Sequence, residues 1–132
     1  MDNNILKTWN PIDDLEGNMF QVESFTDNYN GVSIILKEYN GDRMLKMKFD
    51  DDVLSYRNTN ESFLLKEKIY IIPKDNLKSS LFIVEHSIFL EEFHEKSLSV
   101  YKDWKIIHYL IRTPEDYIDI LSCEFPVVEW LN

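Results

Sequence analysis

Two alternating segments on either side of a turn sequence constrain this fold more than any other feature. Residues 31–38 and 43–49 each place apolar side chains at every second position. This period of two is typical of strands that bury one face. Asn40-Gly41 lies between the segments and favours a tight hairpin, because both residues tolerate positive φ. The sequence therefore predicts two neighbouring antiparallel strands.

Shorter apolar runs on both sides of this hairpin predict further strands. They lie at 20–25, 53–57, 81–84 (a central strand) and 127–131, with a C-terminal hairpin formed by 104–112 and 117–122 around Pro114. Residues 68–72 are one more short apolar run. Because Pro126 restricts the residue before it to an extended conformation, 127–131 is expected to be an edge strand or a docked tail.

One segment, from Ser87 to about Ser97, changes to a helical pattern. Ser87 can cap a helix, Glu91 and Glu92 follow early, and apolar residues recur at helical spacing at positions 89, 90 and 93. The predicted fold class is therefore α+β: an antiparallel β-sheet of about six to eight strands with one main helix packed on one face.

The chain has the length of one domain. It contains 132 residues, without an internal repeat, a low-complexity segment or a linker rich in Gly, Ser or Pro. We expect a single domain over 1–132, in which 1–18 is an N-terminal arm and 19–132 is the α+β body. The arm is expected to be loosely structured and pinned to the body by its apolar side chains, which are Ile5, Leu6, Trp9, Ile12 and Leu15.

Acidic residues outnumber basic ones by 24 to 14, which gives a formal net charge of −10. Six acids face one base in 1–36, eight face nine in 37–84, and ten face four in 85–132. Such a surface repels phosphate backbones, so no nucleic-acid partner is expected, whereas a basic partner would be attracted. The alternative is that the charge only keeps the chain soluble and monomeric.

Composition also predicts the compartment. No apolar run has the length of a secretory signal or a membrane span, so no membrane partner is expected. Cys123 is the only cysteine, which excludes an internal disulfide and a multi-cysteine zinc site and is typical of a reducing compartment. We therefore expect a cytoplasmic protein in which Cys123 is a small buried apolar residue.

The residues that most resemble an active site surround His108. If the C-terminal hairpin is nearly symmetric, Asp119 lies beside His108 across the ladder. With Tyr56, Arg57 and Glu61 these residues could form a polar cluster between strand ends, as in a small-molecule-binding or enzymatic domain. In the simpler interpretation, His108 is a half-buried histidine satisfied by a hydrogen bond, and Arg57 and Glu61 form an ion pair that stabilises a turn.

No stronger chemical signature is present. His86 and His94 lack the spacing of metal ligands, and the run Asp50-Asp51-Asp52 lacks the glycine that a calcium loop requires. There is no phosphate-binding loop, dinucleotide fingerprint or nucleophile elbow. We therefore predict no catalytic residue, no metal and no cofactor, and a protein that is not an enzyme.

Three stretches resemble one family of proteins. They are Phe49-Asp50-x-x-Val53-Leu54-Ser55-Tyr56-Arg57-x-Thr59-x-Glu61, then His108-Tyr109-Leu110-Ile111-x-Thr113-Pro114-x-Asp116-x-Ile118-Asp119-Ile120-Leu121, and Pro126-x-Val128-Glu129-Trp130. They resemble small acidic bacterial immunity proteins, which are encoded beside secreted polymorphic toxins. The resemblance implies stoichiometric neutralisation of a cognate toxin, which would be a basic protein if the acidic surface makes the contact.

The contact surface is predicted from acids of the C-terminal half and one aromatic residue. Tryptophan among acids can act as a binding anchor, and Trp130 near the C-terminus is the candidate. The chain is expected to be a monomer or a weak homodimer through its terminal strand. The predicted partner-binding residues are Glu91, Glu92, Glu95, Glu115, Asp116, Glu129 and Trp130.

Overall fold

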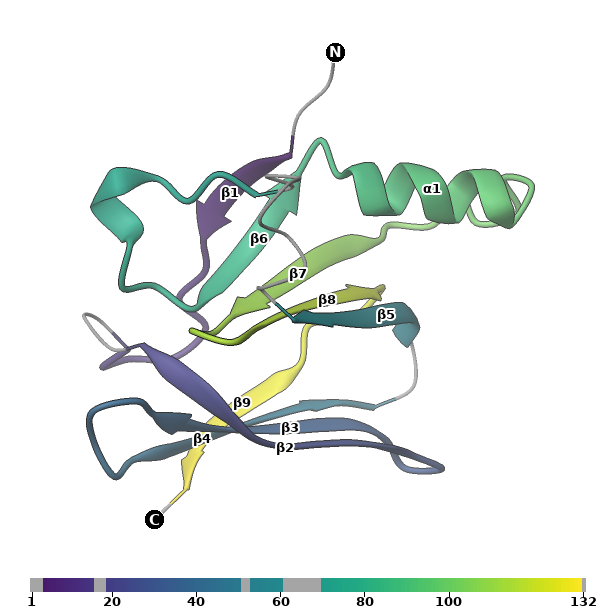
Figure 1. The fold of residues 1–132 in the computed structure, drawn as a ribbon. Coiled ribbons are helices and arrows are strands. Elements are labelled where there is room, and N and C mark those ends of the chain that lie inside the picture. The colour runs from purple at the N-terminus through teal and green to yellow at the C-terminus, as the bar shows by residue number, and fades with distance from the viewer. Residues whose placement is uncertain (1–3, 16–18, 51–52, 61–69, 132) are drawn as a thin grey trace.

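Two antiparallel sheets and one helical layer make up the fold (Figure 1). The computed structural model describes residues 4–15, 19–50, 53–60 and 70–131. We call sheet A the one with the order β1-β6-β7-β8-β5, formed by Ile5–Thr8, Leu81–Glu85, Ile107–Arg112, Asp116–Ser122 and Val53–Asn60. Sheet B has the order β2-β3-β4-β9, formed by Phe20–Asn28, Gly31–Glu38, Met44–Phe49 and Val127–Leu131. The helix α1 (Ile88–Lys96) and the short 3-10 helix η2 (Lys74–Asn76) complete the elements.

The α+β class is confirmed, but the predicted single sheet of six to eight strands is wrong. Nine strands in the described part of the chain divide between two sheets. The reason is packing, since a sheet with one apolar face needs a second layer to cover that face. Alternation along a strand identifies which side chains are buried, but it does not tell which sheet the strand joins.

The main core lies between the two sheets. Ile34, Leu36 and Met47 of sheet B pack there with Ile111 and Ile120 of sheet A, and all five are fully buried. A second apolar cluster covers the other face of sheet A and contains Leu6, Tyr70, Phe82, Val84, Leu110 and Tyr117. Strands β7 and β8 are therefore buried on both faces, which explains their nearly continuous apolar sequence.

Both predicted hairpins are present, but one forms for a different reason. Strand β3 pairs with β4, and β7 pairs with β8. Asn40 and Gly41 have no positive φ, and the connection spans residues 39–43 rather than a two-residue turn. Among the described glycines, the one with positive φ is Gly31, at 109°, the first residue of β3. A Cβ atom there would lie 2.2 Å from the carbonyl oxygen of Phe49, so only glycine fits.

The N-terminal arm is more ordered than predicted. Residues 5–8 form β1, an edge strand that pairs with β6. Leu6 and Leu15 are buried, and Trp9 and Ile12 pack against the main core, whereas Ile5 is exposed. The expected pinning is therefore confirmed for four of the five side chains. Residues 1–3 and 16–18 lie outside the described residues.

The remaining elements follow the sequence closely. Strand β6 lies inside sheet A as predicted, and β9 is an edge strand of sheet B rather than a docked tail. Of the apolar run 68–72, the described residues 70–72 form no strand, although Tyr70 packs on sheet A. Helix α1 follows Ser87 as predicted, and its C-terminal end extends beyond the strands of sheet A (Figure 1).

Candidate functional site

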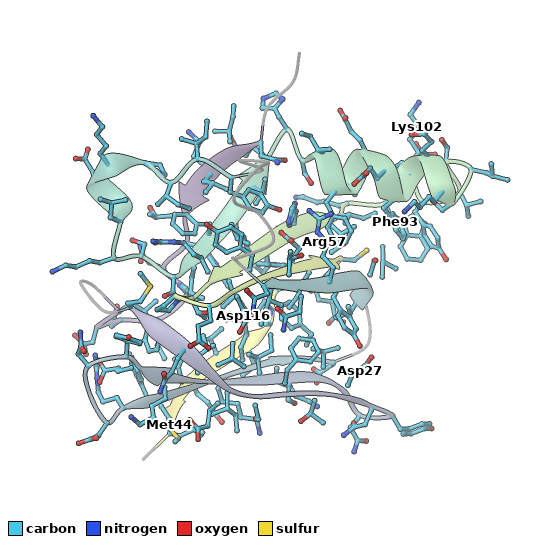
Figure 2. All side chains as sticks on the ribbon, viewed as in Figure 1. Asp27, Met44, Arg57, Phe93, Lys102 and Asp116 are labelled. Atoms are coloured by element: carbon cyan, nitrogen blue, oxygen red, sulfur yellow. The ribbon has the colours of Figure 1, made fainter. Side chains whose placement is uncertain are left out.

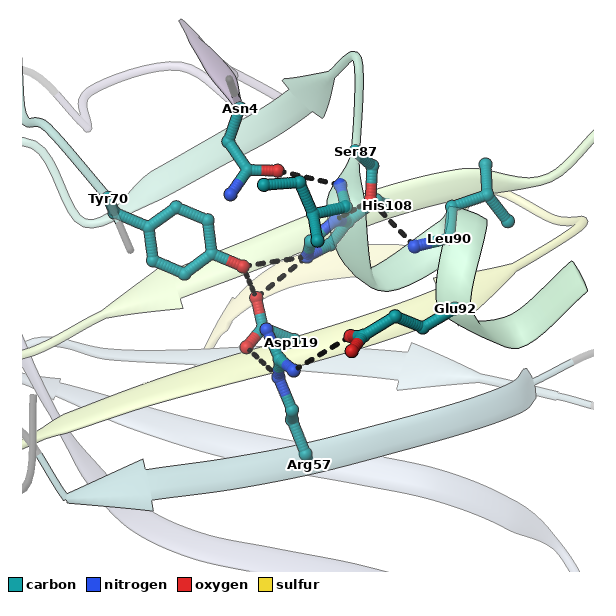
Figure 3. Close-up of polar contacts among 9 residues, drawn as sticks. Asn4, Arg57, Tyr70, Ser87, Leu90, Glu92, His108 and Asp119 are labelled. Carbon is teal, nitrogen blue, oxygen red and sulfur yellow. Dashed lines mark hydrogen bonds and ion pairs between the residues drawn. The ribbon is translucent and has the colours of Figure 1, made fainter. Parts of the chain in front are cut away.

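A chain of polar side chains lies between sheet A and the start of α1 (Figure 3). At its centre, Nε2 of His108 lies 2.7 Å from Oδ1 of Asp119, and both residues are 1% exposed. In the β7–β8 register, Asp119 faces Leu110 and His108 faces Leu121. The predicted contact is confirmed, and it is diagonal across the ladder.

Asp119 accepts hydrogen bonds from two further side chains. Nε of Arg57 donates to Oδ2 over 2.8 Å, since Arg57 is the direct β5 neighbour of Asp119. The hydroxyl group of Tyr70 donates to Oδ1. Burial acts to raise the pKa of Asp119, but the hydrogen bonds from His108, Arg57 and Tyr70 outweigh it and lower the pKa below its usual value. Asp119 is therefore a carboxylate at neutral pH.

The other ring nitrogen of His108 contacts the cap of α1. Nδ1 of His108 lies 2.6 Å from Oγ of Ser87, and the same Oγ accepts a hydrogen bond from the Leu90 N–H over 2.9 Å. Serine, histidine and aspartate thus stand in the order used by many hydrolases. Ser87, however, is 6% exposed, and its oxygen already caps the helix. The arrangement holds α1 on sheet A and does not present a nucleophile.

Arg57 and Asn4 also contact the first turns of α1. The Arg57 guanidinium carbon lies 4.2 Å from the centre of the Phe89 ring, and Nη1 lies 3.8 Å from Oε1 of Glu92. Oδ1 of Asn4 accepts a hydrogen bond from the Ile88 N–H over 2.9 Å. Together with the Ser87 cap, these contacts connect the helix to three strands or their flanking residues (Figure 3).

Only part of the predicted polar cluster comes together. Arg57, His108 and Asp119 do, but Tyr56 does not. Successive side chains of a strand point to opposite faces, so Tyr56 points towards sheet B, where its hydroxyl donates to Oδ2 of Asp27 over 2.7 Å. Figure 2 shows Arg57 and Asp27 on opposite sides of β5. Glu61 lies outside the described residues, so its predicted pairing with Arg57 stays a prediction.

Sequence reasoning missed two residues of this polar network, Tyr70 and Ser87. Ser87 had a signal as a helix cap, but nothing local indicated that its oxygen would also meet a histidine of the next strand. Tyr70 belongs to the short apolar run 68–72, which shows no regular period, so no pattern placed its ring over sheet A. Both contacts join residues far apart in the chain, at separations of 21 and 49 residues.

The predicted partner-binding residues fall in three separate places. Glu91, Glu92 and Glu95 are exposed on α1. Exposed Glu115 and partly buried Asp116 lie at the β7–β8 turn, at the end of the strands away from α1, and Glu129 and Trp130 lie on β9 of sheet B. The seven residues do not form one continuous patch.

Trp130 is not the exposed anchor that the sequence suggested. Its Nε1 donates to the carbonyl oxygen of Asp13 over 3.0 Å, and the guanidinium carbon of Arg43 lies 4.0 Å from the ring centre. The ring also packs against the main core, beside Phe20 at 6.1 Å between ring centres. These contacts give Trp130 a structural role within the chain.

The largest exposed apolar side chains near the acids lie just after the helix. We call residues 88–104, which comprise α1 and the turns that follow it, the α1 arm. Leu98 is 86% exposed, Val100 70% and Trp104 50%. The rings of Phe93, Tyr101 and Trp104 pack in series, with centres 5.5 and 4.8 Å apart. The arm therefore presents acids and apolar groups together.

Hollows lined by described residues lie elsewhere. Two shallow ones, of about 180 and 270 Å³, open between the β2–β3 turn and β5, and share Asp27, Val32 and Val53 in their lining. Neither reaches His108 or Asp119. In the described part of the chain, no three His, Cys, Asp or Glu side chains gather as a metal site would require.

Helix length and comparisons with known proteins add two findings. Among the helices that the structure describes, none has the length and apolar character needed to cross a membrane. No family model, no curated protein and no solved structure matches the chain.

Proposed function

We propose that this chain is a non-enzymatic binding protein that neutralises a cognate bacterial toxin by stoichiometric contact through the α1 arm. The observation that carries the proposal is an exposed stripe along α1 in which acids lie between apolar residues. Ile88, Glu91, Glu95 and Leu98 are all exposed. The spacing of three and four residues places Ile88, Glu91 and Glu95 on one face of the helix, and Leu98 follows the helix end, where the chain turns with a φ of 54°.

The opposite face of α1 is occupied by contacts to the chain itself. Phe89 packs under Arg57, and Phe93 packs against Tyr101. Glu91 and Glu95 therefore point away from sheet A, and the C-terminal end of α1 lies beyond the strands of that sheet (Figure 1). A partner can reach this face without disturbing the fold, because no other described element covers it.

Charge supports a basic partner. The chain has a net charge of −10, and three glutamates are exposed within five residues of α1. Opposite charge steers partners together and accelerates association, most strongly at low salt. The resemblance to immunity proteins leads to the same class of partner, a toxin domain that acts inside bacteria. The proposed location is accordingly the cytoplasm.

The alternative, an enzymatic or small-molecule-binding domain around His108, has less support. The side chains of Ser87, His108 and Asp119 are each engaged with neighbouring groups of the chain and nearly excluded from solvent. A general base needs access to a substrate proton, and a nucleophile needs a free lone pair in a cleft. We therefore assign these residues to positioning α1.

The proposal is tested by capture and by growth. The tagged chain is purified from cells of the organism that encodes it, as wild type, as Glu91→Lys/Glu95→Lys, and as the matched control Glu115→Lys/Glu129→Lys. We expect one stoichiometric basic partner with the wild type and the control, and at least tenfold less captured partner with the α1 variant. Replacing attraction by repulsion should reduce the binding free energy by more than about 1.4 kcal/mol.

The captured partner must also be toxic. Its expression alone should stop the growth of a host, and co-expression of the wild-type chain should restore growth, whereas the α1 variant should not. Thermal unfolding of each variant establishes that the fold is retained. A partner that is not toxic, or capture that survives the α1 reversal unchanged, would overturn the proposal.

A further inference from the structure

The α1 helix ends in a left-handed turn made of two residues that rarely adopt this conformation. Leu98 has φ 54° and Ser99 has φ 61°. The Leu98 N–H donates to the Glu95 carbonyl over 3.2 Å, and the Ser99 N–H donates to the His94 carbonyl over 2.8 Å. These two bonds define a Schellman cap, in which the position of Leu98 is usually glycine. A leucine there is strained, because its Cβ crowds the backbone.

Burial of the Leu98 side chain does not offset this strain. The side chain is 86% exposed, so its apolar surface stays in water. Asparagine or glycine would satisfy the same backbone with less strain and less exposed apolar area. Strain that packing does not repay is typical of residues held ready for a partner.

The turns that follow hold this tip in place. Val100, Lys102 and Trp104 each donate a backbone hydrogen bond to the residue three positions earlier, over 3.2, 3.2 and 2.9 Å. The packed rings of Tyr101 and Trp104 support the turns from one side. A tip fixed in this way loses little conformational freedom on binding, which favours affinity.

We infer that Leu98 is the anchor residue of the α1 arm and that it inserts into an apolar pocket, rimmed by basic side chains, on the partner protein. The inference rests on the proposed function and names the contact within it. Apolar anchors at the centre of an interface usually contribute most of the binding energy. Glu95 and Glu91 lie about one and two turns behind the tip, where they would meet the basic rim.

An apolar tip could also enter a lipid bilayer, but the charges favour a protein. The α1 arm carries exposed acids at positions 91, 92, 95 and 103 against two exposed lysines, Lys96 and Lys102. An anionic membrane surface would therefore repel the arm as a whole. A protein pocket can instead offer opposite charge at the rim. Vesicles are therefore included in the test as the competing partner.

The first test separates stability from binding. We expect Leu98→Asn and Leu98→Gly to raise the Tm by about 2–4 °C, because strain is relieved and no buried surface is lost. Val100→Asn is the matched control: it removes a similar exposed apolar group at a residue without positive φ, and it should leave the Tm unchanged. A fall in Tm for both Leu98 variants would overturn the inference, since Leu98 would then serve the fold.

The second test locates the contact. Benzoylphenylalanine is placed at position 98, at position 91 or at position 29, where Tyr29 is fully exposed on the β2–β3 turn far from α1, and living cells are irradiated. We expect a covalent product at 98 and 91 and none at 29, with apolar residues in the partner peptide joined to position 98. A product at 91 without one at 98 would overturn this inference and leave the proposed function intact.

The third test compares partners. Vesicles of phosphatidylcholine with one-third phosphatidylglycerol should not retain the wild-type chain in flotation. For the complex with the captured protein, Leu98→Asn should raise the Kd about tenfold to a hundredfold. Retention on vesicles that Leu98→Asn abolishes would overturn the inference in favour of a membrane. An unchanged Kd for the captured protein would overturn it outright. If no product forms at either 91 or 98, the proposed function fails as well.

Discussion

At the scale of residues, Asp119 is the group on which the most interactions converge. It accepts hydrogen bonds from Arg57, Tyr70 and His108 while it is 1% exposed. Removing a carboxylate from water costs free energy, so Asp119 stabilises the fold only through the hydrogen bonds that it accepts. Asparagine at this position keeps one acceptor oxygen and puts an N–H donor in place of the other, so at least one of these donors loses its acceptor and the fold is destabilised.

Asp119→Asn is therefore expected to destabilise the chain. We expect the free energy of unfolding to fall by about 2–3 kcal/mol, less than for a fully buried pair because the Arg57 side chain is 33% exposed. Asp116→Asn on the same strand, with its side chain partly exposed, should change it by under about 0.5 kcal/mol. Urea unfolding measures both, and equal effects would contradict the assigned role.

The pH dependence of stability follows from the same carboxylate. Because the folded state lowers the pKa of Asp119 below its ordinary 3.8, the stabilisation is complete above that value and is lost as pH falls through the folded pKa. Glu38, whose pKa is lowered mainly by the hydrogen bond from Arg43, acts in the same direction. The wild type should therefore lose stability below about pH 4, and Asp119→Asn should lose less over that range. An equally steep loss in the variant would refute this.

At the scale of elements, the start of α1 depends on one serine. Ser87 caps the helix and contacts Nδ1 of His108, so Ser87→Ala removes the cap and leaves a buried ring nitrogen unpaired. We expect a loss of about 2–3 kcal/mol and faster amide exchange throughout α1. Ser97→Ala, at the other end of the helix, loses only bonds to the Phe93 and His94 carbonyls and should cost under about 1 kcal/mol.

The β2–β3 turn depends on one glycine. Gly31→Ala would bring a Cβ to 2.2 Å and 2.3 Å from the carbonyl oxygens of Phe49 and Asp50, at a φ of 109°. Because these contacts are with backbone, strands must separate, and we expect a loss above about 2 kcal/mol in thermal or urea unfolding. Gly41→Ala is the control, since its Cβ would meet side-chain atoms of Glu38 rather than backbone. Similar losses at both sites would show that the turn tolerates the strain.

The sequence predicts the elements where periodicity is strong and fails where it is weak. β3 and β4 alternate buried and half-buried residues throughout, and their pairing followed from that pattern. β1 buries only Leu6 of its four residues, so it had no period to detect. The candidate site divides in the same way: the His108–Asp119 contact followed from one local hairpin, whereas the roles of Ser87 and Tyr70 depend on contacts across the fold.

At the scale of the whole molecule, the polar chain and the α1 arm form one system. Three strands of sheet A hold His108, Asp119 and Arg57, and these side chains set the position of a helix whose far face is acidic and whose tip is apolar. The rigid sheets position the arm, and the net charge of −10 favours a basic partner over a nucleic acid. We therefore propose that the exposed arm makes the contact with the partner and that the buried His108 supports the arm.

Association kinetics with the captured partner test this account most directly. Surface plasmon resonance measures the association rate of the wild type and of Glu91→Lys/Glu95→Lys from low to high salt. We predict that the wild-type rate falls steeply with salt, and that the variant associates at least about tenfold more slowly at low salt and depends less on salt. Equal rates with equal salt dependence would contradict the claim that the α1 arm makes the contact.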